Sequence, residues 1–103
     1  MKRVLLPLLA VLSVACSTPA LADLALATSK NCMACHNVER KVLGPSFKDI
    51  AAKYKGDAGA ADVLAGKIRK GGAGVWGPVP MPANTQVSEA DAKKLAAWVL
   101  STK

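Results

Sequence analysis

The chain has 103 residues, the size of one small domain. It contains 14 Lys and Arg against seven Asp and Glu, a formal charge of +7. That charge favours an acidic partner or an anionic membrane surface, but no base-stacking aromatics accompany it, which argues against nucleic-acid binding. The aromatic residues are Phe47, Tyr54, Trp76 and Trp98, so a core made by the chain alone would be thin.

The first 22 residues have the pattern of a secretory signal peptide. Lys2 and Arg3 give a positive start, residues 4–14 are mostly apolar, and residues 20–22 read small-x-small. The apolar stretch is too short to span a bilayer as a helix. We therefore expect export to the periplasm and cleavage before Asp23. The domain is then residues 23–103, with a formal charge of +5 because Lys2 and Arg3 are lost.

Two alternatives concern this N-terminal segment. It could be retained as an anchor, although its length argues against that. Cys16 follows Val14 and Ala15, which partly fits a lipidation motif. Ser13 stands where Leu is usual in such a motif, and a better cleavage site follows, so we expect Cys16 to be removed with the signal.

Two helices are expected early in the domain. The first covers residues 24–34, with Asp23 placed to cap it. The second covers residues 47–53, with Ser46 as its N-cap and Asp49 in its first turn, where a negative charge favours the helix dipole.

Two more helices follow. Residues 60–70 carry an apolar face that ends at a glycine pair, 71–72. Ser88 is placed to cap the last helix. The expected apolar positions are Val63, Leu64 and Ile68 in the third helix, and Ala92, Leu95, Ala96 and Val99, with Trp98 alongside, in the fourth.

Residues 71–87 connect these last two helices and are rich in Gly and Pro. Prolines remove backbone donors and bias the residues before them to extended angles, so this segment is expected to be a stiff extended loop. No alternating strand pattern occurs in the chain. The expected fold is therefore all-α.

The strongest motif is C-x-x-C-H at residues 32–36, which is the attachment sequence of c-type haem. Cys32 and Cys35 can add to the two vinyl groups on one edge of a porphyrin, and His36 can bind the iron as the proximal ligand. A thioredoxin-like redox pair would need a strand–helix unit nearby. A zinc site would need four N or S ligands, more than the domain offers.

A second axial ligand can be sought by elimination. His36 is the only His, and Met33 lies between the attachment cysteines, on the wrong side of the haem. Met81 remains, held between Pro80 and Pro82. A thioether ligand raises the reduction potential relative to a second His. The alternative is a methionine that only fills the core.

Two residues near these ligands are candidates for supporting roles. The turn at Gly44 and Pro45 can offer a carbonyl to the His36 ring N–H, or it can be an ordinary turn before a helix. Trp76 has one N–H donor that can reach a haem propionate, or it can simply pack in the core.

The domain resembles the small bacterial class I cytochromes c of the c-551 type. The resemblance implies about four helices wrapped round one haem, with His36 and Met81 as axial ligands. It further implies that Pro45 supplies a carbonyl to the proximal His, that Trp76 bonds a propionate and that Asn84 lies near the Met ligand. The matching stretches are residues 30–36, 42–54, 74–82 and 96–101.

The sequence departs from the family pattern at two places. Ala27 replaces the usual aromatic of the first helix, and Lys67 stands where an Arg on the propionate side is usual, although Arg69 is close. Both departures concern the propionate contacts and the potential rather than the ligation.

The expected function is single-electron transfer, not enzymatic catalysis, between a membrane respiratory complex and a terminal reductase or oxidase. Docking is expected to be transient, steered by charge and completed by a small apolar patch. A monomer without stable membrane insertion is expected. The alternatives are a haem enzyme or gas sensor with a labile sixth ligand, and a thiol–disulfide module.

Overall fold

A computed structural model describes residues 19–103 of the chain. This part contains four α-helices, one short 3₁₀ helix and no strand, which confirms the all-α prediction. The elements are α1 (Pro19–Ser29), η1 (Cys32–Ala34), α2 (Phe47–Lys53), α3 (Ala60–Lys70) and α4 (Glu89–Ser101).

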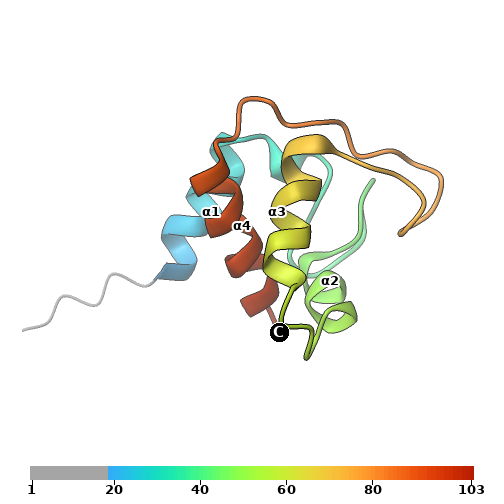
Figure 1. Ribbon diagram of the computed structural model, residues 1–103, viewed down its shortest axis with the longest axis horizontal. Helices are drawn as coiled ribbons and strands as arrows, with labels where there is room; N and C mark the ends of the chain where they lie inside the picture. Colours follow the sequence, from blue (N-terminus) through green and yellow to red (C-terminus); the bar gives the residue numbers. More distant parts are fainter. Residues whose placement is uncertain (1–18) are drawn as a thin grey trace, which may run out of the picture.

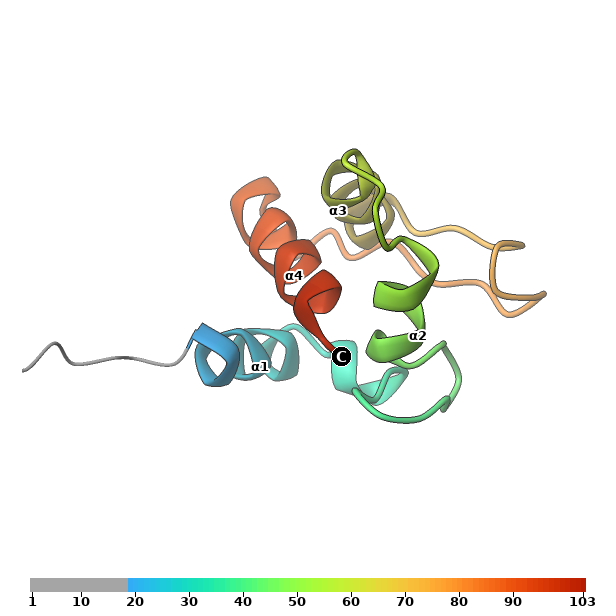
Figure 2. The same ribbon diagram turned by 90° about the horizontal axis from the view of Figure 1, so that it is seen from below.

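The last helix, α4, is the centre of the fold. It packs against α1, α2 and α3, which surround it in both views (Figures 1 and 2). Its predicted apolar stripe is confirmed, because all of its members are buried. They are Ala92, Leu95, Ala96, Trp98 and Val99.

Serine caps begin α2 and α4, as predicted. Ser46 Oγ accepts from the backbone N–H of Asp49 at 3.0 Å, and Ser88 Oγ accepts from that of Asp91 at 3.1 Å. Each bond satisfies one of the free donors of a first helical turn. Ser46 is almost fully buried, so its cap also belongs to the core.

The third helix, α3, has the predicted bounds. Its chain turns at Gly71, whose φ of 72° is in the left-handed region that glycine adopts without strain. Ala60 and Ala65 are buried and Leu64 packs partly against the core, whereas Val63 is about half exposed. The prediction that Val63 belongs to the buried face was wrong, because the face centres on positions 60, 64, 65 and 68 and Val63 lies outside it.

The first helix differs from the prediction at both ends. It begins at Pro19, so Asp23 lies inside the helix rather than at its N-cap. It ends at Ser29 because Asn31 takes a left-handed conformation, with φ 64°. Asn tolerates this conformation better than most residues, and the chain resumes as the separate helix η1.

The segment between α3 and α4 is irregular, as predicted. Figures 1 and 2 show it leaving the end of α3, running out past the helices and returning to α4. Its one regular feature is an isolated antiparallel bridge between Gly72 and Met81. This bridge joins the outgoing and returning parts of the segment near the end of α3.

The predicted signal peptide and Cys16 fall mainly outside the described residues, and α1 begins upstream of the expected cleavage point. The boundary between residues 22 and 23 therefore stays a prediction. Within residues 19–103, no helix combines the length and the apolar character needed to cross a membrane.

Candidate functional site

A cavity of about 450 Å³ opens between the helices and the 71–87 segment. This volume is within the range of about 300–1,000 Å³ typical of small-molecule and cofactor sites. Its wall is mainly apolar and includes six of the predicted site residues. They are Cys32, Cys35, His36, Pro45, Trp76 and Met81.

Cys32 and Cys35 stand on one tight turn at the cavity wall. The backbone N–H groups of Cys35 and His36 both donate to Cys32 O, at 3.2 and 3.0 Å. The two thiols are half-buried and do not form a disulfide. Burial raises the pKa of the Cys32 thiol. The turn places both thiols on one short stretch of backbone, as covalent attachment to one edge of a haem requires.

The imidazole of His36 is buried, with 9% of the residue exposed, and its orientation is fixed. Nδ1 lies 2.8 Å from the Pro45 carbonyl oxygen. A carbonyl can only accept, so Nδ1 carries the proton and Nε2 keeps its lone pair. That is the form in which imidazole binds a metal, with the second nitrogen oriented by a backbone carbonyl.

Two further neighbours hold the His36 ring. Phe47 stacks on it, with ring centroids 5.1 Å apart and an interplanar angle of 25°, and Trp98 meets Phe47 edge-on at 5.3 Å. The backbone of Gly44 is so close that a Cβ there would lie 2.6 Å from His36 Cε1. Sequence reasoning placed Gly44 only in the turn that offers a carbonyl to His36, and it identified neither this close approach nor Phe47 as a support of the ring.

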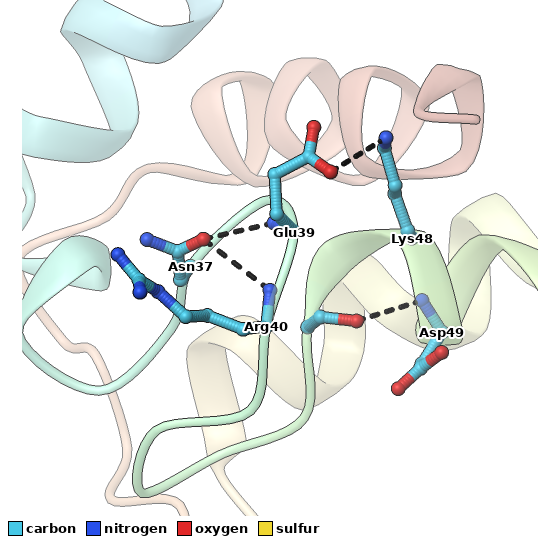
Figure 3. A network of polar contacts seen from close by, with 6 residues as sticks. Asn37, Glu39, Arg40, Lys48 and Asp49 are labelled. Atoms are coloured by element: carbon cyan, nitrogen blue, oxygen red, sulfur yellow. Dashed lines mark hydrogen bonds and ion pairs between the residues drawn. The ribbon is translucent and has the colours of Figure 1, made fainter.

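The loop that follows His36 is tied to the start of α2 (Figure 3). Asn37 Oδ1 accepts from the backbone N–H groups of Glu39 and Arg40, at 2.8 and 3.3 Å. The Lys48 ammonium pairs with the Glu39 carboxylate at 2.8 Å, and Phe47 N–H donates to Asn37 O at 3.0 Å. These contacts fix both ends of the turn that presents Pro45 O to His36.

Met81 reaches the same cavity from a distant part of the chain. Gly72 N–H donates to Met81 O at 3.0 Å and Met81 N–H donates to Gly72 O at 2.8 Å, so the end of α3 sets its backbone position. A Cβ on Gly71 would collide with Met81 O and with Ala83 N. The methionine is thus held close to a backbone that only glycine permits.

The other two predicted residues lie at the edge of this arrangement. Trp76 lines the cavity but is 41% exposed, and Lys53 Nζ lies 5.4 Å from its ring centroid. Asn84 does not line the cavity, because its amide donates to Ile68 O at 2.9 Å. The proposed contact of Trp76 with a propionate, and the proposed place of Asn84 near the Met ligand, stay predictions.

The donor set of the site fits haem c better than a bare metal ion. Within residues 19–103, no three His, Cys, Asp or Glu side chains cluster as a metal site would require. The cavity instead offers two thiols on one turn, a fixed imidazole with a free lone pair, a thioether and a large apolar wall. This is the chemistry that a covalently bound porphyrin iron needs.

Comparison with known proteins agrees with this assignment. The family model for cytochrome c matches residues 24–103. Cytochrome c-552 of Nitrosomonas europaea is 60% identical over 82 residues, which are 80% of either chain. Cytochrome c-551 of Stutzerimonas stutzeri is 52% identical over the whole of both chains. The crystal structure of wild-type Nitrosomonas europaea cytochrome c552 superposes with a TM-score of 0.76 at 59% identity, covering 78% of this chain and 99% of that one.

The fold and the site thus define a small c-type cytochrome. The chain belongs to the cytochrome c family and, within it, to the class I cytochromes of the c-551 type. Its cofactor is one haem c, bound covalently through Cys32 and Cys35. The protein is an electron carrier.

Proposed function

We propose that the protein moves single electrons in the periplasm between a membrane respiratory complex and a terminal reductase or oxidase, with His36 and Met81 as the axial ligands. One observation carries the proposal: an imidazole and a thioether from distant segments line a single cavity. A carrier needs both axial positions filled, because an open position invites ligand chemistry instead.

The haem supplies the redox centre, which gains or loses one electron at its iron. The chain's own residues keep that centre in one geometry. Pro45 holds the His36 ring through Nδ1, and the bridge to Gly72 holds the backbone of Met81. Supports of this kind limit the structural change between oxidation states.

The rim of the cavity suits brief docking to an acidic partner. Several apolar side chains stand half or more exposed there, and no acidic residue lines the cavity. The charged lining residues are Lys41 and Lys67, and the exposed apolar ones are Val42, Leu43, Val75 and Val79. Positive charge steers the encounter and the apolar rim completes a small, weak interface.

The periplasmic assignment is supported by the N-terminal pattern. The intact mass of the protein purified from the periplasm tests it. We expect residues 23–103 plus one haem, with no free thiol. Two titratable thiols and no added mass would instead indicate a thiol–disulfide module.

The proposed axial ligation is tested by the ferric absorption spectrum. A methionine bound to ferric haem iron gives a weak far-red band, which we expect in the wild type and expect to be lost in Met81→Ala. Met33→Leu is the matched control and should keep the band. If the wild type lacks the band and Met81→Ala leaves the spectrum unchanged, the sixth position is labile, and the alternative of a haem enzyme or gas sensor replaces the carrier.

A further inference from the structure

The segment that carries Met81 is held to the rest of the chain by two sets of hydrogen bonds. Near its start, the Gly72–Met81 bridge ties it to the end of α3. Near its end, the side chain of Asn84 ties it to α3, and the side chain of Gln86 ties it to Lys30, the residue that follows α1. The second set is made by side chains, so single substitutions can remove its hydrogen bonds without changing the backbone.

The side-chain amide of Asn84 can form its hydrogen bonds in only one orientation. Its backbone N–H and its Nδ2 both donate to Ile68 O, at 3.2 and 2.9 Å, and Nδ2 also lies 3.4 Å from Pro82 O. Both oxygens are backbone carbonyls, which can only accept. The amide nitrogen must therefore face α3, and Oδ1 must face the opposite way.

The side chain of Gln86 donates a hydrogen bond to that oxygen. Its Nε2 donates to Asn84 Oδ1 at 3.2 Å and to Lys30 O at 3.3 Å. Lys30 Nζ in turn donates to Gln86 O at 3.5 Å. Lys30 stands two residues before Cys32, so one carboxamide joins the haem-attachment turn to the segment that carries Met81.

We propose that Gln86 is a positioning residue for Met81, and that it acts by holding the Asn84 amide against α3 and by linking it to Lys30. The proposal rests on the proposed ligation by Met81 and adds a residue that controls how firmly that ligand is held. Gln86 itself does not line the cavity. Its effect is therefore on the stability of the closed segment.

Amide hydrogen exchange in the reduced holoprotein, followed by NMR, tests the proposal. The informative amides are those of Met81 and Asn84, which donate to Gly72 O and Ile68 O. Loss of a hydrogen bond of ordinary strength corresponds to roughly 2- to 10-fold faster opening. We expect that acceleration at both amides in Gln86→Ala and in Gln86→Glu. The Glu variant keeps the size of the side chain but has no hydrogen to donate to Lys30 O or Asn84 Oδ1.

Two controls separate positioning from general loosening. Thr85→Ala changes an exposed neighbour without a side-chain hydrogen bond among the described residues and should leave both rates unchanged. The amide of Leu95 in the buried face of α4 reports global opening. Wild-type rates in Gln86→Glu, or an equal acceleration at Leu95, would overturn the proposal.

Binding of added imidazole to the ferric holoprotein gives a second readout, because imidazole must displace the sixth ligand. We expect its rate to rise roughly 2- to 10-fold in both Gln86 variants and not in Thr85→Ala. An unchanged rate in both Gln86 variants would overturn the proposal. Failure of the proposed ligation itself is distinguishable. The wild type would then lack the far-red methionine band, while amide exchange would still report whether the hydrogen bonds of Gln86 hold the segment.

Discussion

His36 is oriented by three neighbours of different kinds: the Pro45 carbonyl, the Phe47 ring and the bare backbone of Gly44. The carbonyl selects the tautomer and the ring covers one face. Gly44 has a steric role, because its N–H donates to Cys35 O at 2.8 Å and draws its Cα close to the imidazole. An imidazole held on three sides keeps its orientation without a charged partner.

Gly44→Ala tests this arrangement. The new Cβ would lie 2.6 Å from His36 Cε1 and 2.9 Å from Nδ1, so either the ring or the 42–45 turn must move. Overpacking of this kind costs about 1–3 kcal/mol of stability. We expect that loss in thermal unfolding of the holoprotein, together with a shifted reduction potential.

Gly66→Ala is the matched control. Nothing lies within 4 Å of a Cβ at Gly66, which is inside α3. Alanine stabilises a helix interior by about 0.5–1 kcal/mol relative to glycine. We expect a slightly higher melting temperature and an unchanged potential. Equal behaviour of the two alanine variants would show that Gly44 does not constrain the ring.

At the scale of the helices, the short α2 does more than fill space. It has seven residues, too few to be stable alone. Its cap, Ser46, directly follows Pro45, and its first residue, Phe47, stacks on His36. The beginning of α2 therefore helps to hold the His36 ring as well as forming part of the fold.

Ser46→Ala should accordingly affect both stability and the haem. Loss of the Oγ bond to Asp49 N–H from this buried site should cost about 1–2 kcal/mol. The displaced turn should also shift the reduction potential. Ser88→Ala is the comparison, because it removes the same bond from α4 at an exposed site away from the cavity. It should lower stability and leave the potential unchanged, and a potential unchanged in both variants would contradict the proposed link.

The sequence predicted elements well where a local signal marked them. Ser46 and Ser88 predicted the starts of α2 and α4, and the glycine at position 71 predicted the end of α3. No local rule required Asn31 to take a left-handed conformation, so the break between α1 and η1 was missed. The contacts of Gln86 with Lys30 were equally invisible, because they join residues 56 positions apart.

The site was predictable to a similar degree. A five-residue motif identifies Cys32, Cys35 and His36, and elimination leaves Met81. The place of Asn84 near the Met ligand, which the resemblance implies, stays a prediction, and the sequence did not indicate that its amide donates to a carbonyl of α3. Which donor reaches which acceptor depends on how α3 and the 71–87 segment pack, and that information is not local to either.

At the scale of the whole molecule, the core is thin and surrounds a space. Among the residues whose burial the structure describes, five of the eleven buried apolar ones are alanines: Ala27, Ala60, Ala65, Ala92 and Ala96. Larger apolar side chains such as Leu64 and Ile68 are only partly buried and line the cavity. We therefore expect the haem to complete the core and folding to be coupled to cofactor binding.

Removal of the covalent link tests that coupling. Cys32→Ala combined with Cys35→Ala prevents attachment, and without haem the apolar cavity wall has nothing to pack against. We expect the exported variant to lose its dispersed NMR spectrum and its cooperative thermal transition. Cys16→Ala, which changes a cysteine expected to leave with the signal, should give the wild-type holoprotein. A double variant that still unfolds cooperatively, with well-dispersed amide signals, would contradict this expectation. It would show that α1, α3 and α4 form a stable core without the haem.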